Sequence, residues 1–210
     1  MPMTQACCVS QAARTRRPQQ GFTMLEVLVS LLILLIGLLG LAGLLVTTQQ
    51  GEVEAYQRKQ ATVLLQDMVD RITANPVAAA TCYAITNSAT GAPALGTGYG
   101  GSLDCGSISP WSRGTADLQA WNNALLGTSE NKAGANVGGI IEARGCVSNT
   151  ATGVYAVSVA WRGLAPSTLA PLVTRNACGK DQYKDASNAA DERLRRVISV
   201  TIRIADLKAP

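Results

Sequence analysis

The chain has 210 residues, a formal net charge of +4 and no histidine. Because histidine is the usual general base and the commonest metal ligand, we expect neither an enzyme nor a bound metal or cofactor. Three arginines, Arg14, Arg16 and Arg17, lie in the first 21 residues without any acid, and removing their charge from +4 leaves +1 for the rest. Net charge therefore predicts no nucleic-acid binding.

An apolar stretch follows these arginines from Gly21 to Val46 and reads GFTMLEVLVSLLILLIGLLGLAGLLV. Residues 27–46 carry no charge, and a helix of that length spans ~30 Å of hydrocarbon. The stretch therefore predicts a membrane-spanning helix. A cleaved secretory signal is a poor alternative, because no small-residue cleavage site follows. A plain signal anchor explains the arginines and the apolar run.

A signal anchor does not explain Glu26, the one acid in this stretch. A charge costs roughly 2.5 to 3.5 kcal/mol at the middle of a membrane helix and less near the headgroups, so an acid there is a functional candidate. Two simpler interpretations stay open. Glu26 snorkels to the headgroups, or it complements the helix dipole from the first turn.

These residues resemble the start of the type IV prepilins and the related pseudopilins: a short basic leader ending in Gly21, then Phe22, then an apolar helix with Glu26 as its fifth residue. The resemblance implies that a prepilin peptidase cuts after Gly21 on the cytoplasmic side and methylates the new amine of Phe22. It also implies that Glu26 pairs with the Phe22 amine of a neighbouring subunit during assembly.

Apolar residues continue at helical spacing beyond the membrane segment, at Leu65, Met68, Val69 and Ile72. This pattern predicts an amphipathic continuation of the same helix. We expect one helix from Phe22 to Asn75, because Pro76 cannot continue the hydrogen-bond ladder. Its apolar stripe needs a cover, which the C-terminal half of the chain can provide.

The end of this predicted helix resembles the PilV group of minor pilins. The matching residues are Leu64, Leu65, Asp67, Met68, Asp70, Arg71, Ile72, Ala74, Asn75 and Pro76. For Asp67, Asp70 and Arg71 two interpretations stay open. They contact a neighbouring minor pilin, or they form a solvated face with an Asp67–Arg71 pair at i, i+4.

Six cysteines divide between the leader and the rest of the chain. Cys7 and Cys8 precede the cleavage site, whereas four remain beyond the membrane segment, where disulfides persist: Cys82, Cys105, Cys146 and Cys178. Four cysteines allow three pairings. We favour the two pairs nearest in sequence, Cys82 with Cys105 and Cys146 with Cys178.

The region after the long helix predicts a mixed structure. Residues 86–110 are rich in Gly, Ser, Thr and Pro and predict an irregular loop. A short helix is expected from Thr115 to Leu126, ended by Gly127. Strands are expected at Val137–Val147, Val154–Trp161 and Leu194–Ile204.

These elements predict an α+β fold of the type IV pilin kind, in which a long N-terminal helix packs on a small antiparallel β-sheet. We expect residues 1–21 to form a leader peptide and residues 22–46 a transmembrane and assembly helix. Residues 47–76 would continue the helix in amphipathic form. Residues 77–210 would form a periplasmic, β-rich globular domain.

The resemblance implies a minor pilin that primes assembly of a type IV pilus and is incorporated into it, supporting twitching motility and adhesion. Its partners would be prepilin peptidase, the inner membrane, and other minor pilins and the major pilin in a hetero-oligomeric filament or tip complex. The precursor would lie in the bacterial inner membrane, with its N-terminus cytoplasmic and its C-terminal domain periplasmic.

Two alternative functions stay open. A minor pseudopilin of a type II secretion system has the same leader and helix. A pilus-tip adhesin would carry a ligand site on its globular domain, for which the loop at residues 86–110 is the candidate surface.

Overall fold

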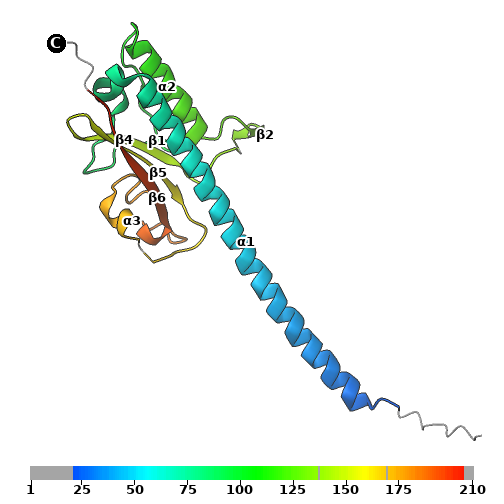
Figure 1. Cartoon of the computed structure of the whole chain (residues 1–210). Helices are drawn as coiled ribbons and strands as arrows, with labels where there is room; N and C mark the ends of the chain where they lie inside the picture. The colour runs from blue at the N-terminus through cyan, green and yellow to red at the C-terminus, as the bar shows by residue number, and fades with distance from the viewer. Residues whose placement is uncertain (1–20, 137, 169, 206–210) are drawn as a thin grey trace, which may run out of the picture. The chain divides into compact units, whose positions relative to one another are not determined.

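Figure 1 shows a computed structural model of the chain, which describes residues 21–136, 138–168 and 170–205. The leader arginines and Cys7 and Cys8 lie outside the described residues. The chain divides into two compact units after Thr47. The first holds the apolar beginning of helix α1 (Met24–Ala74), and the second holds the remainder of α1 and everything that follows.

Helix α1 ends at Ala74, one residue before the predicted Asn75, and begins at Met24, two residues after the predicted Phe22. Asn75 has φ −136° and ψ 63°, outside the helical region, and Pro76 opens a short 3₁₀ turn, η1 (Pro76–Ala78). A π-helical turn, η2 (Ala79–Tyr83), continues it. Proline ends the helix here because it offers no N–H and restricts the residue before it. The chain therefore leaves α1 abruptly and is free to return over its side.

An antiparallel sheet of four strands forms the centre of the second unit, in the order β1–β4–β5–β6. The strands are β1 (Leu95–Gly96), β4 (Arg144–Ala151), β5 (Val154–Arg162) and β6 (Arg195–Arg203). Val157 in the middle of β5 lies opposite Val147 on one side and Val200 on the other. A separate small hairpin joins β2 (Asn131–Lys132) to β3 (Ala135–Asn136).

The predicted α+β architecture is confirmed, but the bounds of one strand are corrected and one further strand was not predicted. The strand expected at Val137–Val147 begins only at Arg144 and runs on to Ala151, while Val137 itself lies outside the described residues. Extended backbone cannot start earlier because Glu142 has a φ of 51°, in the left-handed region. Strand β1 was not expected, since it is two residues long and lies inside the glycine-rich loop.

Helix α2 (Trp111–Leu125) starts four residues before the predicted Thr115. Its first turn contains Gly114, and a Cβ built there would lie 2.5 Å from the sulfur of Cys82. Glycine lowers helix propensity, yet only glycine lets α2 approach η2 so closely. The helix ends before Gly127, whose φ of +69° suits the residue after a helix.

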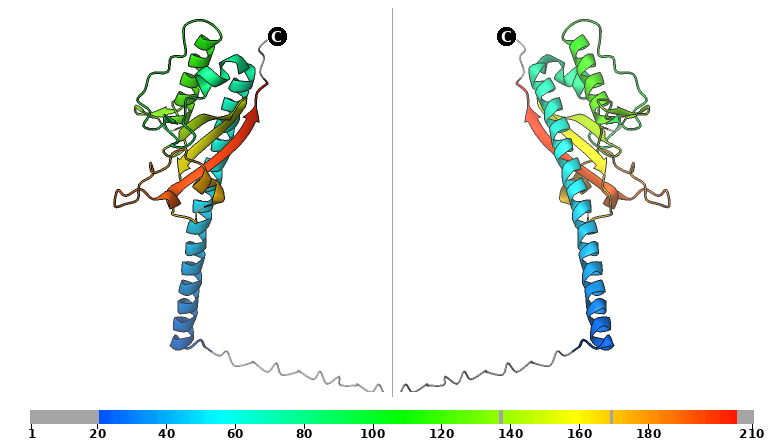
Figure 2. Two further views of the ribbon diagram at one scale, coloured as in Figure 1. Left: turned by 90° about the vertical axis from the view of Figure 1, so that its left-hand side faces the viewer. Right: turned by 90° about the vertical axis from the view of Figure 1, so that its right-hand side faces the viewer.

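The main core lies between the helices and one face of the sheet (Figure 2). Helix α1 contributes Ala61, Leu65, Met68 and Ile72, and α2 contributes Leu118, Trp121 and Leu125. The sheet contributes Val147, Tyr155, Val157, Val159 and Trp161. The amphipathic stripe of α1 is therefore covered by the sheet and by α2, as the sequence pattern required.

A second cluster lies on the opposite face of the sheet. It comprises Cys146, Ala160, Val173, Cys178, Tyr183, Leu194 and Val197. The segment that supplies it runs from α3 (Pro171–Arg175) through a polar loop to the 3₁₀ turn η3 (Glu192–Leu194). Residues alternate between the faces along a strand, so Ala160 of β5 belongs to this cluster while Val159 and Trp161 belong to the main core.

Candidate processing and assembly site

The residues around the predicted cleavage site lie just outside helix α1. Thr23 caps the helix, because its Oγ1 and carbonyl oxygen accept from the N–H of Glu26 at 3.2 and 3.0 Å. Threonine followed three residues later by glutamate is the capping-box sequence. A Cβ built on Gly21 would meet none of the described residues within 4 Å, and Phe22 is 82% exposed. The Gly21–Phe22 bond is thus accessible and free of helical hydrogen bonds, as a protease requires.

The carboxylate of Glu26 is exposed and makes no hydrogen bond or ion pair with any of the described residues. Only its backbone is engaged, the carbonyl accepting from Ser30 Oγ at 2.7 Å. In the uncut precursor the nitrogen of Phe22 is an uncharged amide. The described residues therefore supply no counter-charge for Glu26.

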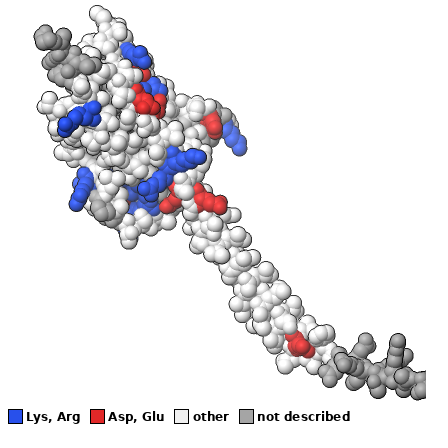
Figure 3. Space-filling model, viewed as in Figure 1, with Lys and Arg blue, Asp and Glu red and all other residues white. Residues whose placement is uncertain are grey.

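The apolar segment, residues 22–46, exposes its side chains on every side. Each of its large hydrophobic residues is at least 48% exposed. Figure 3 shows the charged side chains gathered mainly over the second unit and a largely uncharged surface along this segment. Among the described residues, α1 is the one helix long and apolar enough to cross a membrane, with a mean hydropathy of 2.9 in its most apolar window. A helix that is apolar all round requires lipid or other helices around it.

The residues that resemble the PilV group form a polar network at the end of α1. Arg71 donates from Nε to Asp67 at 2.9 Å and from Nη1 to Asp117 of α2 at 3.1 Å. The hydrogen bond that Arg71 donates to Asp67, together with the two nearby carboxylates, raises the pKa of Arg71. This pairing joins α1 to α2 across a partly buried boundary.

Tyr83 and Asn75 complete the network. Tyr83 donates its hydroxyl to the second oxygen of Asp117, and Asn75 donates from Nδ2 to Tyr83 at 3.2 Å and to the carbonyl of Pro110 at 3.1 Å. Burial, and then the hydrogen bond to Asp117, raise the pKa of Tyr83 well above its usual value. The network therefore holds the end of α1, η2 and the start of α2 together.

Of the three candidate partner-contact residues, Asp67 and Arg71 lie in this internal network, and Asp70 does not. Asp70 is exposed and accepts from Gln66 Nε2 at 3.0 Å on its own helix. Sequence reasoning missed Asp117 and Tyr83. The four-residue spacing of Asp67, Arg71 and Asn75 signals a shared helix face, but no local pattern points to the other two.

The structure joins Cys82 to Cys105 and Cys146 to Cys178, with Cα atoms 5.3 and 5.9 Å apart. These are the pairs favoured from their sequence spacing. The first disulfide ties η2 to the end of the glycine-rich loop. The second ties β4 to the segment after α3. The two bonds therefore anchor both irregular segments of the second unit to its regular elements.

A comparison with protein families finds one match, to the prokaryotic N-terminal methylation motif, over residues 16–42. No curated protein and no solved structure was found to match the chain. The match includes the accessible Gly21–Phe22 bond and Glu26, and it supports a type IV prepilin-like protein. Such a motif implies processing by prepilin peptidase and assembly with other pilins, and with the apolar helix it fits an inner-membrane-anchored protein.

Proposed function

We propose that this protein is a minor pilin of the PilV group, cut between Gly21 and Phe22, which primes assembly of a type IV pilus and is incorporated into it. The observation that carries the proposal is the methylation motif at the start of an apolar helix that is exposed all round and leads into an α+β unit. Residues 67–76 at the end of α1 resemble the PilV group, and this resemblance narrows the proposed family from type IV prepilins in general to that group.

Glu26 has a specific role in this proposal. Cleavage turns the nitrogen of Phe22 into a cation among apolar helices, and the unpaired carboxylate of Glu26 on a neighbouring subunit neutralises it. Leaving one charge of a buried pair without its partner costs ~3 to 5 kcal/mol. A subunit in correct axial register is therefore favoured over one that is displaced along the filament.

The globular unit would select the neighbours of this subunit in a hetero-oligomeric filament or tip complex. Its role is structural rather than catalytic, in keeping with a chain that contains no histidine. Asp70 is the predicted contact residue that remains available, because its carboxylate lies exposed on α1. In the proposed topology the N-terminus is cytoplasmic and this unit is periplasmic, until assembly moves it into the pilus.

The second candidate function is that of a minor pseudopilin in a type II secretion system. The observation that favours it is the extent of the family match, since residues 16–42 cover the part that pilins and pseudopilins share. Deleting the gene in its host separates the two. Loss of pili and twitching supports the pilin, whereas loss of protein secretion with normal pili supports the pseudopilin.

N-terminal mass spectrometry of the protein purified from its native membrane tests the proposal. The expected first residue is an N-methylated Phe22. A Gly21→Leu variant is the matched control and should retain the leader, because the peptidase would lose its cleavage residue. An intact leader on the unsubstituted protein, with an active prepilin peptidase in the same cells, would contradict both candidate functions.

A further inference from the structure

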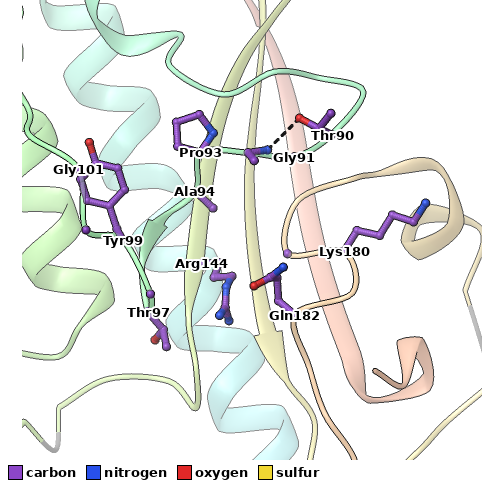
Figure 4. Close-up of a pocket in the computed structure, with 14 residues that line it drawn as sticks. Thr90, Gly91, Pro93, Ala94, Thr97, Tyr99, Gly101, Arg144, Lys180 and Gln182 are labelled. Atoms are coloured by element: carbon purple, nitrogen blue, oxygen red, sulfur yellow. Dashed lines mark hydrogen bonds between the residues drawn. The ribbon is translucent and has the colours of Figure 1, made fainter. Parts of the chain in front are cut away.

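The second unit contains an open pocket of about 400 Å³ on the side of the glycine-rich loop. Figure 4 shows its three walls. Residues 90–94 and 97–101 form the first, Arg144 at the start of β4 forms the second, and Gly179, Lys180 and Gln182 form the third. This volume lies within the range of small-molecule sites. The glycine-rich loop thus contributes to a defined concave surface.

The pocket is positively charged. Its lining contains Arg144 and Lys180 and no acidic residue. Neither cation takes part in an ion pair within the described part of the chain. The Arg144 guanidinium donates a long hydrogen bond, 3.5 Å from Nη1 to the carbonyl of Glu142, among the described residues. Most of its donors are therefore available to an anion, and guanidinium matches a carboxylate in bidentate geometry.

The ring of Tyr183 holds the Arg144 side chain in place. Its guanidinium lies 5.3 Å from the centre of the Tyr183 ring, a cation–π contact. Burial raises the pKa of Tyr183, so the ring stays neutral and does not act as a counter-ion. Gly179 leaves room for the ring, since a Cβ there would lie 2.9 Å from the Tyr183 hydroxyl. The cation is thus positioned without being neutralised.

The walls of the pocket are also fixed. Gly91, with φ of +68°, packs so closely on the turn after α3 that a Cβ would lie 1.9 Å from the carbonyl oxygen of Ala177. The Cys146–Cys178 disulfide joins β4 to that turn, and Cys82–Cys105 anchors the far end of the loop. The pocket is therefore pre-formed, which lowers the entropy cost of binding a ligand.

The remaining lining favours a hydroxylated ligand. Thr90, Thr97, Tyr99 and Gln182 offer hydroxyl and amide groups, and the apolar residues are only Ala92, Pro93 and Ala94. Nothing in the lining would bury a large aliphatic group. We propose that the pocket binds a carboxylate-bearing sugar of the uronic acid class, its carboxylate on Arg144 and its hydroxyls on the threonine and glutamine side chains, with the exposed Lys180 adding positive charge to the lining. This goes beyond pilus assembly and does not depend on it.

Isothermal titration of the full chain in a sugar-free zwitterionic detergent tests this proposal, with galacturonic acid as the probe and galactose as its neutral match. Galacturonic acid should bind and galactose should not. Losing a charge-assisted hydrogen bond typically weakens binding about tenfold or more, so we expect at least that loss for Arg144→Gln. Lys180→Gln, at an exposed position, should weaken binding a few-fold and leave folding unchanged. Arg203→Gln removes an exposed arginine outside the pocket and should bind normally.

Several results would overturn the proposal. If galactose bound equally well, the pocket would not recognise the carboxylate. If acetate bound equally well, it would not recognise the sugar. Tighter binding of an aspartate-rich peptide would point to a protein ligand instead. Absence of any binding by the folded protein, or binding that survives both Arg144→Gln and Lys180→Gln, would exclude this pocket as the site. The processing state of the chain, measured separately, has no bearing on these outcomes.

Discussion

The two halves of α1 contain similar apolar residues, but these residues are exposed in the first half and a stripe of them is covered by other elements in the second. Along residues 22–46 every large hydrophobic side chain is exposed, whereas Ala61, Leu65, Met68 and Ile72 are at most 7% exposed. The first half has an apolar surface that the other described residues leave uncovered. The second half finds its cover in the sheet and in α2. The first half is thus built for lipid and neighbouring subunits, and the second for folding.

This difference separates two kinds of mutational effect. Changes in the first half should alter membrane assembly and leave the stability of the globular unit alone. Changes at the buried positions of the second half should do the reverse. All three tryptophans, Trp111, Trp121 and Trp161, lie in the second unit. Tryptophan fluorescence of the full chain in detergent therefore reports on the folding of that unit by itself.

The largest effect is expected from Glu26→Val in the first half. The variant leaves the Phe22 amine of a neighbour without a counter-charge, and a loss of ~3 to 5 kcal/mol corresponds to a hundredfold or more in equilibrium. Immunoblots of sheared pili from cells that make only the variant should show the subunit missing, with an unchanged fluorescence melt. Glu52→Gln removes an acid from the same helix and should be incorporated normally. Full incorporation of the valine variant would disprove the amine pairing.

Trp121→Ala should have the largest effect on folding. Trp121 is fully buried, and its Nε1 donates to the carbonyl of Leu64 on α1 at 2.8 Å. Truncating a buried tryptophan typically costs 3 to 5 kcal/mol, or roughly that range here. Chemical denaturation of the full chain measures the loss. Tyr56→Ala, at an exposed aromatic residue of α1, should cost less than about 0.5 kcal/mol. Similar losses in the two variants would refute the division between covered and uncovered faces.

Removing the Cys146–Cys178 disulfide should have the next largest effect. The bond closes a loop with a sequence separation of 32, for which the chain-entropy estimate is about 3 to 4 kcal/mol. A Cys146→Ala/Cys178→Ala double variant should therefore unfold at lower denaturant concentration. The unsubstituted protein should lose more stability under reducing conditions, because both disulfides break, whereas the double variant loses only Cys82–Cys105 and should lose less. A variant as stable as the parent would mean that packing alone holds these segments.

Asp117→Asn should be less destabilising, by about 1 to 3 kcal/mol, because it removes the charge that Arg71 and Tyr83 share at a partly buried position. Asp70→Asn is the matched control on the exposed face of α1 and should change stability by less than about 0.5 kcal/mol. If Asp70 contacts a neighbouring pilin, Asp70→Asn should reduce incorporation into the pilus more than Asp117→Asn does. Equal effects of the two substitutions on stability would argue against the network as a folding element.

The smallest effect is a pH dependence from Tyr83. Its pKa is raised in the folded chain, by burial and then by Asp117, so the folded state favours the protonated hydroxyl. The stability from this group is complete below the ordinary tyrosine pKa of about 10 and is lost as the pH rises above it. Melting temperatures from pH 8 to pH 11 should fall more for the unsubstituted protein than for Tyr83→Phe. Parallel curves would assign the alkaline loss to other groups.

Much of the fold could be predicted from local patterns. Strands β5 and β6 begin and end within one residue of the predicted bounds, because their apolar alternation has one interpretation. The start of strand β4 could not be predicted. It is set by the left-handed backbone of Glu142, which the apolar pattern of the sequence does not reveal. The candidate site divides in the same way. Gly21, Phe22 and Glu26 form a contiguous motif, whereas Asp117 reaches Arg71 from 46 positions away.

The sequence by itself determined the apolar segment, its single acid and the amphipathic stripe that follows, because charge and helical periodicity are local properties. Only the tertiary structure decided what the polar residues do. It directed Arg71 to Asp117 of α2, left Asp70 exposed, and placed Arg144 and Lys180 in the lining of one pocket. Those outcomes depend on which distant segments of the chain pack together around the sheet. This packing is fixed by two disulfides and by close contacts at Gly91 and Gly114.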